Sequence, residues 1–157
     1  MADSRQTDVA ECDVYISRAF AAPRDRLFRL WMQPEQLASW FGPSGYSVPE
    51  GSVNVQAHAG GRWDLTMVED ATGRGFPVRA RIDEFHEPEL IVMTMSAETG
   101  LESASAVMLR VQFHDHGDRT RVTLHQGPFS TQLGEDTATG WQMSFDKIDA
   151  ILAAENG

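Results

Sequence analysis

The chain has 157 residues, of which 41% are hydrophobic, and its 23 acidic and 13 basic side chains give a formal net charge of -10. This length predicts one domain with its own core, and the acidic balance argues against nucleic acid or an anionic membrane as a partner. The single cysteine, Cys12, excludes an internal disulfide and favours a cytoplasmic location. The opening residues, MADSRQTDVAECD, lack the features of a signal peptide, and no apolar run suggests membrane insertion.

The first third of the sequence predicts one strand followed by two short helices. Residues 14–20, VYISRAF, are β-branched and aromatic, and we expect residues 1–12 before them to form a flexible tail. The stretch LFRLWMQPEQLASWFGP, residues 27–43, places apolar residues at i, i+3, i+4 on both sides of Pro34. The proline should end the first helix and begin the second, which we expect to run to Phe41 before Gly42 and Pro43.

After residue 45 the apolar period changes to two, which predicts about six antiparallel strands with one apolar face each. Residues 46–63 suggest an irregular strand with a turn at Gly60 and Gly61, and the segment HDHGD, 114–118, suggests a hairpin turn. Near the end, Trp141, Phe145, Ile148 and Leu152 form a single helical stripe within residues 139–154. The sheet and this helix must bury their apolar faces against each other, which makes the fold α+β.

Several short motifs resemble those of one family. The residues AFAAPRDRLFRLWMQPEQLASWFGP, AGGRWDLTM, DEFHEPELIVMTM, TRVTLHQGPF and GWQMSFDKI occur in the order expected for the family named for the activator of the heat-shock-protein-90 ATPase. The resemblance covers roughly residues 13 to 154. It implies the helix-grip (START-like, SRPBCC) fold. In this fold a bent antiparallel sheet of about six or seven strands wraps a long C-terminal helix, with two short helices after the first strand. We therefore expect a single START-like domain over residues 13–155.

The resemblance also implies a cavity between sheet and helix that binds a hydrophobic or aromatic small molecule. A role in activating a heat-shock protein carries over poorly, because the co-chaperone that names the family has a separate N-terminal domain for which we expect no room here. A heat-shock-protein partner is thus disfavoured, although it stays open, as does a homodimer. No cofactor is implied.

The candidate ligand-binding residues are those whose phase directs them between sheet and helix. They are Trp40, Phe41, Trp63, Leu65, Met67, Met93, Met95, Phe113, Gln126, Trp141, Phe145 and Arg18.

Each of these candidates has an alternative role that the sequence leaves open. Trp40 and Phe41 line the cavity mouth or pack as ordinary core, and the methionines accept varied ligands or fill gaps. Arg18, on the inward phase of the first strand, anchors an anionic ligand or reaches solvent near the strand end. Gln126 bonds a ligand or satisfies backbone groups. It stands where many family members have histidine, which weakens the case for acid–base chemistry.

The sequence predicts no catalytic residues and no metal site. His114 and His116 lack the further ligands that zinc requires, and no nucleophile elbow or phosphate loop is present. We therefore expect a cytoplasmic ligand-binding domain rather than an enzyme. The alternatives are a polyketide cyclase or dehydratase that uses the same cavity, and a co-chaperone-like interaction module, which would need an exposed apolar patch.

Overall fold

A computed structural model describes residues 13–96, 107–128 and 131–156. The expected tail at residues 1–12 lies outside these residues. The strands are β1 (Val14–Phe20), β2 (Tyr46–Ser47), β3 (Asn54–Val55), β4 (Trp63–Glu69), β5 (Gly75–His86), β6 (Leu90–Ser96), β7 (Val107–His116) and β8 (Arg119–Gly127). The helices are α1 (Arg24–Met32), α2 (Pro34–Ala38), the short 3-10 helix η1 (Glu50–Ser52) and α3 (Thr131–Asn156).

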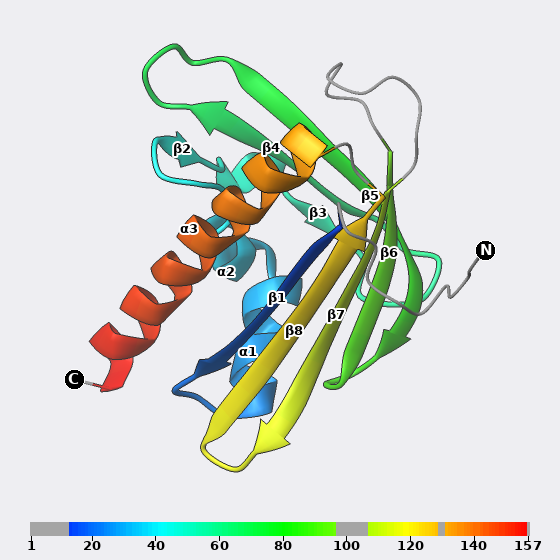
Figure 1. Ribbon diagram of the computed structural model, residues 1–157, viewed down its shortest axis with the longest axis vertical. Helices are drawn as coiled ribbons and strands as arrows, with labels where there is room; N and C mark the ends of the chain where they lie inside the picture. The colour runs from blue at the N-terminus through cyan, green and yellow to red at the C-terminus, as the bar shows by residue number, and fades with distance from the viewer. Residues whose placement is uncertain (1–12, 97–106, 129–130, 157) are drawn as a thin grey trace.

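The strands form one antiparallel sheet in the order β1-β8-β7-β6-β5-β4-β2, with β3 paired to β4. Figure 1 shows this sheet curling around α1, while the long α3 crosses its open side. Rings from α1 and α3 contact the sheet directly. The ring centroids of Phe28 and Phe113 of β7 are 5.2 Å apart, and those of Phe145 and Phe20 of β1 are 5.4 Å apart; ring distances below are also between centroids. The helix-grip architecture expected from the sequence is therefore confirmed.

The inner face of the sheet follows the predicted alternation. Ile82, Met93, Leu109 and Leu124 come from four different strands, and each is fully buried. These residues face inward although the pairing of β5 with β6 shifts its register between Ile82 and Glu84. Because one face of each strand is buried, the period of two fixes which residues reach the interior.

The irregular strand expected over residues 46–63 is a composite of β2, η1 and β3, followed by a tight turn. Gly60 has a φ of 86°, which favours glycine. A Cβ on Gly61 would lie 2.2 Å from the carbonyl oxygen of Gln56. The backbone of Ile82 bonds both glycines of the turn, accepting from Gly60 and donating to Gly61. The Gly-Gly pair thus allows this turn to press against β5.

Three boundaries differ from those predicted. The second helix ends at Ala38 rather than Phe41, since the N–H groups of Ser39 and Trp40 bond to carbonyls three residues earlier and the chain then turns at Gly42, which has a φ of 104°. The last helix begins at Thr131, eight residues before the predicted start, and runs through Gly134 and Gly140. His114 lies within β7 rather than in a turn, and its Nε2 is 3.1 Å from the hydroxyl of Thr123.

None of the described helices is long and apolar enough to cross a membrane.

Candidate ligand-binding site

Four tryptophans from different parts of the chain meet between the sheet and α3, and we call them the tryptophan cluster: Trp31, Trp40, Trp63 and Trp141. The ring of Trp31, on α1, lies nearly parallel to that of Trp63 at 6.1 Å and to that of Trp141 at 5.6 Å. Trp40 tilts against Trp31 at 4.9 Å. Trp31 is thus the ring that contacts all the others. Offset contacts of this kind stabilise aromatic pairs beyond the area they bury.

Two members of the cluster complete the C-terminal end of α1. The last four carbonyl groups of a helix have no partner within it. Here the indole Nε1 of Trp40 donates to the carbonyl of Leu30 at 2.7 Å, and that of Trp63 donates to the carbonyl of Trp31 at 3.0 Å. Both carbonyls belong to the last turn of α1. These indoles therefore have a structural role as well as any role in binding.

The remaining two indoles differ from each other. Trp141 Nε1 donates to Gln126 Oε1 at 2.7 Å, and the amide nitrogen of Gln126 lies 3.1 Å from the sulfur of Met95. Trp31 Nε1 is buried and has no hydrogen-bond partner among the described residues. The cluster therefore contains one N–H group whose hydrogen-bonding capacity is unused.

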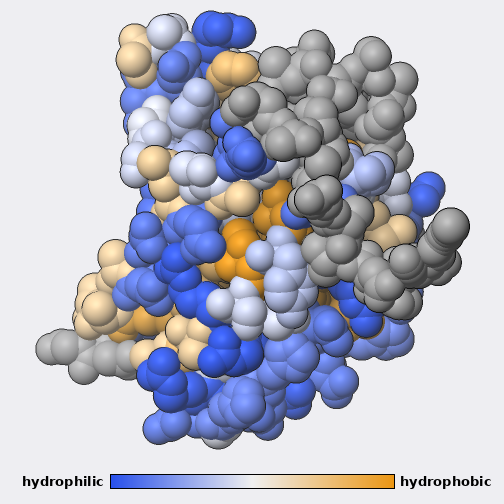
Figure 2. All heavy atoms as spheres, in the orientation of Figure 1, coloured by the Kyte–Doolittle hydropathy of each residue, from blue (hydrophilic) through white to orange (hydrophobic). Residues whose placement is uncertain are grey.

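Within the tryptophan cluster, Trp141 is 6% exposed, whereas Trp31, Trp40 and Trp63 are fully buried. The adjacent Phe41 is 8% exposed, so the site comes nearest to the surface at these two rings. The ring of Phe41 stands edge-on to both Trp63 and Trp141, at 5.5 Å from each. We call this contact between Phe41 and Trp141 the seam. Figure 2 shows a small hydrophobic area on the face that includes α3, with hydrophilic residues along one side of it.

Two side chains of α3 hold the loop that follows Phe41. Ser144 Oγ accepts from the backbone N–H of Gly42 at 3.1 Å, and Lys147 Nζ donates to the carbonyls of Pro43 and Tyr46 at 3.3 Å each. Burial lowers the pKa of Lys147, and the nearby Asp70 carboxylate partly opposes that shift. The loop at the seam is therefore attached to α3 by three hydrogen bonds.

The structure brings most of the predicted lining residues together around the cluster. Phe113 lies 6.2 Å from Trp31, and Phe145 lies 6.0 Å from Trp141. Leu65, Met93 and Met95 are buried in the same core, and Met67 packs against it while partly exposed. Their contact with a ligand stays a prediction.

Sequence reasoning missed three residues of this site. The spacing of Trp31 predicts a place in the apolar stripe of its helix but carries no sign that its N–H would lack a partner. The other two residues are Ser144 and Lys147. Both lie on the α3 turns that also carry Trp141 and Phe145, so their helical spacing from those residues was an available signal.

Arg18 lies on the inward phase of β1, as predicted, but at a position that faces α3. Its guanidinium donates to Asp146 at 2.9 Å and to Asp149 at 3.0 Å, and it lies over the ring of Phe145 at 5.7 Å. The charge that the sequence left open to an anionic ligand is therefore engaged by the helix.

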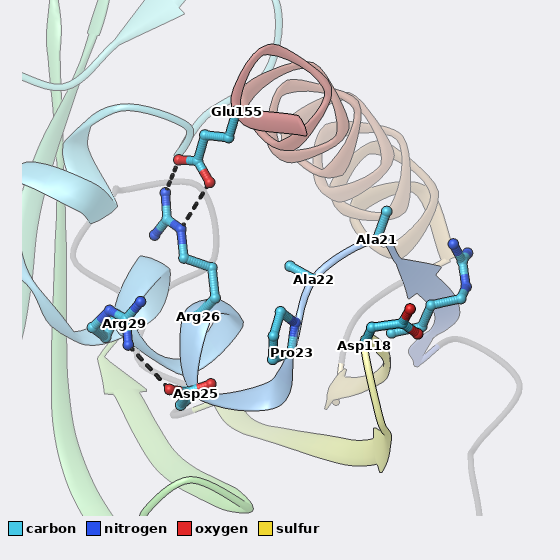
Figure 3. A pocket seen from close by; sticks show the side chains of 9 residues that line it. Ala21, Ala22, Pro23, Asp25, Arg26, Arg29, Asp118 and Glu155 are labelled. Carbon is cyan, nitrogen blue, oxygen red and sulfur yellow. Dashed lines mark hydrogen bonds and ion pairs between the residues drawn. The ribbon is translucent and has the colours of Figure 1, made fainter. Parts of the chain in front are cut away.

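A polar groove of about 570 Å³ lies elsewhere, where the β1–α1 loop, the β7–β8 turn and the end of α3 meet. Figure 3 shows Arg26 and Glu155 pointing toward each other across it, and Arg29 paired with Asp25. The hydrogen bond from Arg26 lowers the pKa of Glu155, against a smaller effect of burial. Since most of its charges are paired with one another, this groove offers a weaker site than the cluster.

No group of three or more histidine, cysteine, aspartate or glutamate side chains within the described ranges could hold a metal ion.

Solved structures of other proteins share this fold. The structure resembles that of protein CV1439 from Chromobacterium violaceum, with a TM-score of 0.80 and 21% identity over 90% of this chain and 97% of that chain. It also resembles the AHSA1 protein from Silicibacter pomeroyi, with a TM-score of 0.79 and 22% identity over 91% and 99% of the two chains. At these identities the likeness shows the fold alone.

No curated protein matches the sequence. The family described as activator of Hsp90 ATPase homolog 1-like protein matches residues 21–153. This match confirms the resemblance seen in the motifs, and it spans most of the chain. The protein therefore belongs to the family of activator of Hsp90 ATPase homolog 1-like proteins.

Proposed function

We propose that this domain binds an apolar or aromatic small molecule between the sheet and α3, beside the tryptophan cluster. The observation that carries the proposal is the run of nearly parallel rings Trp63, Trp31 and Trp141, which comes nearest to the surface at the seam. A flat apolar molecule that enters there would stack on these rings in place of Phe41. A cytoplasmic location, supported by the single cysteine, is part of the proposal.

Two features support an adaptable site. Met93 and Met95 are buried two residues apart on the same face of β6, and a Cβ added at Gly42 would lie 3.5 Å from the sulfur of Met67. Methionine side chains adjust to varied apolar shapes. The loop beyond Phe41 is attached to α3 through Ser144 and Lys147, and a ligand at the seam would have to compete with these bonds.

The polar content of the interior favours binding over catalysis. Among the described residues, the buried polar side chains are Thr120, Gln126 and Ser144, and none of them titrates near neutral pH. Acid–base catalysis needs a positioned group with a pKa near the working pH. Tyr15 and Met108 are the large hydrophobic residues of the described part that are more than half exposed, which gives little support to a co-chaperone-like surface.

A thermal-shift screen against apolar and aromatic metabolites tests the proposal, with tryptophan fluorescence as a second signal. A ligand present at 100 times its dissociation constant should stabilise the protein by about 2.7 kcal/mol. The variant Phe41→Ala removes the ring at the seam, and Phe85→Ala is the matched control because Phe85 packs against Phe28, away from the seam.

We expect Phe41→Ala to lower the dissociation constant of a hit at least about 10-fold, a difference of about 1.4 kcal/mol, because the ligand takes the place of this ring. Phe85→Ala should leave the dissociation constant nearly unchanged. Silence across the library, or equal effects of the two variants, would contradict the proposal.

A further inference from the structure

The indole N–H of Trp31 is the unused donor of the tryptophan cluster. Its Nε1 is buried and without a hydrogen-bond partner in the described part of the chain, and the residue is fully buried. Buried donors of this kind are rare in folded proteins, because desolvation without a bond is costly. An orphaned donor inside a candidate ligand site therefore calls for an acceptor.

Three acceptors of the cluster are already engaged by its other indoles. The carbonyls of Leu30 and Trp31 accept from Trp40 and Trp63, and Gln126 Oε1 accepts from Trp141. The aromatic rings in contact with Trp31 are the other three indoles and Phe113.

The charges nearest to the cluster favour a neutral acceptor. Arg18 is engaged with Asp146 and Asp149, and Lys147 donates to backbone carbonyls of the loop. Because these two cations already have partners, an anionic group bound beside Trp31 could not pair with either of them. An unpaired buried charge is strongly disfavoured. A carbonyl oxygen meets the need without a charge.

We propose that the ligand is a neutral aromatic carbonyl compound whose oxygen accepts the Trp31 Nε1–H bond while its ring stacks in the cluster. This inference rests on the proposed function and adds the chemical class of the ligand. It assigns Trp31 as the residue that distinguishes a ketone from a hydrocarbon of the same shape. A site built to bond a polar group discriminates against an analogue that lacks it, because the protein donor is then left unpaired.

The experiment uses 1-indanone and indane, which share a skeleton and differ in the carbonyl group. The ratio of their dissociation constants is measured by titration of the full chain, monitored by the ¹H–¹⁵N signals of the four indoles. Trp31→Phe removes the donor and keeps a ring. Phe85→Ala is the control, because Phe85 packs against Phe28, away from the seam.

We expect the preference for the ketone to be about 5- to 10-fold greater in the wild type than in Trp31→Phe, which is the effect of one buried hydrogen bond. Phe85→Ala should keep the wild-type preference. The ketone should move the Trp31 indole proton downfield, and indane should not. That shift in the wild type decides the matter even if a variant fails to fold.

Equal preferences in the wild type and in Trp31→Phe, with both compounds bound, would overturn this inference and leave the proposed function standing. Trp31 would then donate to a buried water or an aromatic face. Failure of both compounds, together with silence of the broader screen, would overturn the proposed function and the inference with it.

Discussion

Replacing single tryptophans of the cluster by phenylalanine should separate their hydrogen bonds from their packing. Trp63→Phe and Trp31→Phe remove the same atoms from two fully buried rings, so the cost of lost apolar contact is similar. The variants differ in the N–H group. Trp63→Phe leaves the carbonyl of Trp31 buried without its donor, whereas Trp31→Phe removes a donor that has no partner among the described residues.

The expected difference follows from the cost of an unsatisfied buried group, about 1–3 kcal/mol. Trp63→Phe creates one such group and Trp31→Phe removes one. The free energy of unfolding should therefore be lower in Trp63→Phe than in Trp31→Phe by at least about 2 kcal/mol. For a domain of this size that is a difference of about 4–8 °C in melting temperature.

Urea denaturation followed by far-ultraviolet circular dichroism is the assay, because it does not depend on the tryptophan signal that the variants alter. Trp40→Phe should behave like Trp63→Phe, since its indole donates to the carbonyl of Leu30 at the same helix end. Equal losses of stability in all three variants would refute the reasoning. The indole hydrogen bonds would then make no contribution to stability beyond that of ring packing.

Three further predictions concern other parts of the fold. Gly61→Ala should destabilise the protein by about 1–3 kcal/mol through overpacking of the turn, whereas Gly51→Ala, with open space at its Cβ, should be nearly neutral in the same urea assay. The pKa of Glu155 is lowered, so its pair with Arg26 stabilises the fold above the ordinary glutamate value of 4.5, and that effect is lost as the pH falls through the folded-state pKa. The difference in urea midpoint between wild type and Glu155→Gln should therefore be present at pH 7 and should diminish as the pH is lowered below 4.5. Arg18→Gln should reduce the free energy of unfolding by about 1 kcal/mol or less, as for other partly exposed ion pairs. Calorimetry should find its affinity for a neutral ligand unchanged; a changed affinity would show that Arg18 belongs to the ligand site.

Much of the fold could be predicted because burial on one face imposes a short period on the sequence. The strand phases that placed Leu65, Met93 and Phe113 inside depend only on alternation, and the stripe of Trp141 and Phe145 depends only on helical spacing. The early start of α3 was missed because glycine lowers the helical preference of the segment before Trp141, and tertiary packing overrode that preference.

The details of the site could not be predicted, because they depend on contacts between residues far apart in the chain. Nothing in the spacing of Trp63 indicates that its N–H completes the end of α1, 32 residues earlier. The same holds for Arg18, whose strand phase was correct but whose partners lie on α3. Periodicity tells which side chains turn inward, whereas the choice of hydrogen-bond partner is settled only when the elements pack.

Gln126 shows how these partner choices bear on function. Its amide serves Trp141 as an acceptor and approaches Met95 as a donor, so both of its polar atoms are engaged inside the core. A histidine at this position would bring a group that titrates near pH 6.5 into the interior, whereas the amide keeps the same charge and hydrogen-bonding pattern across the physiological range. The other buried polar side chains of the described residues, Thr120 and Ser144, are likewise uncharged. The use of glutamine here, beside the unused N–H donor of Trp31, is therefore consistent with the proposed binding of a neutral molecule.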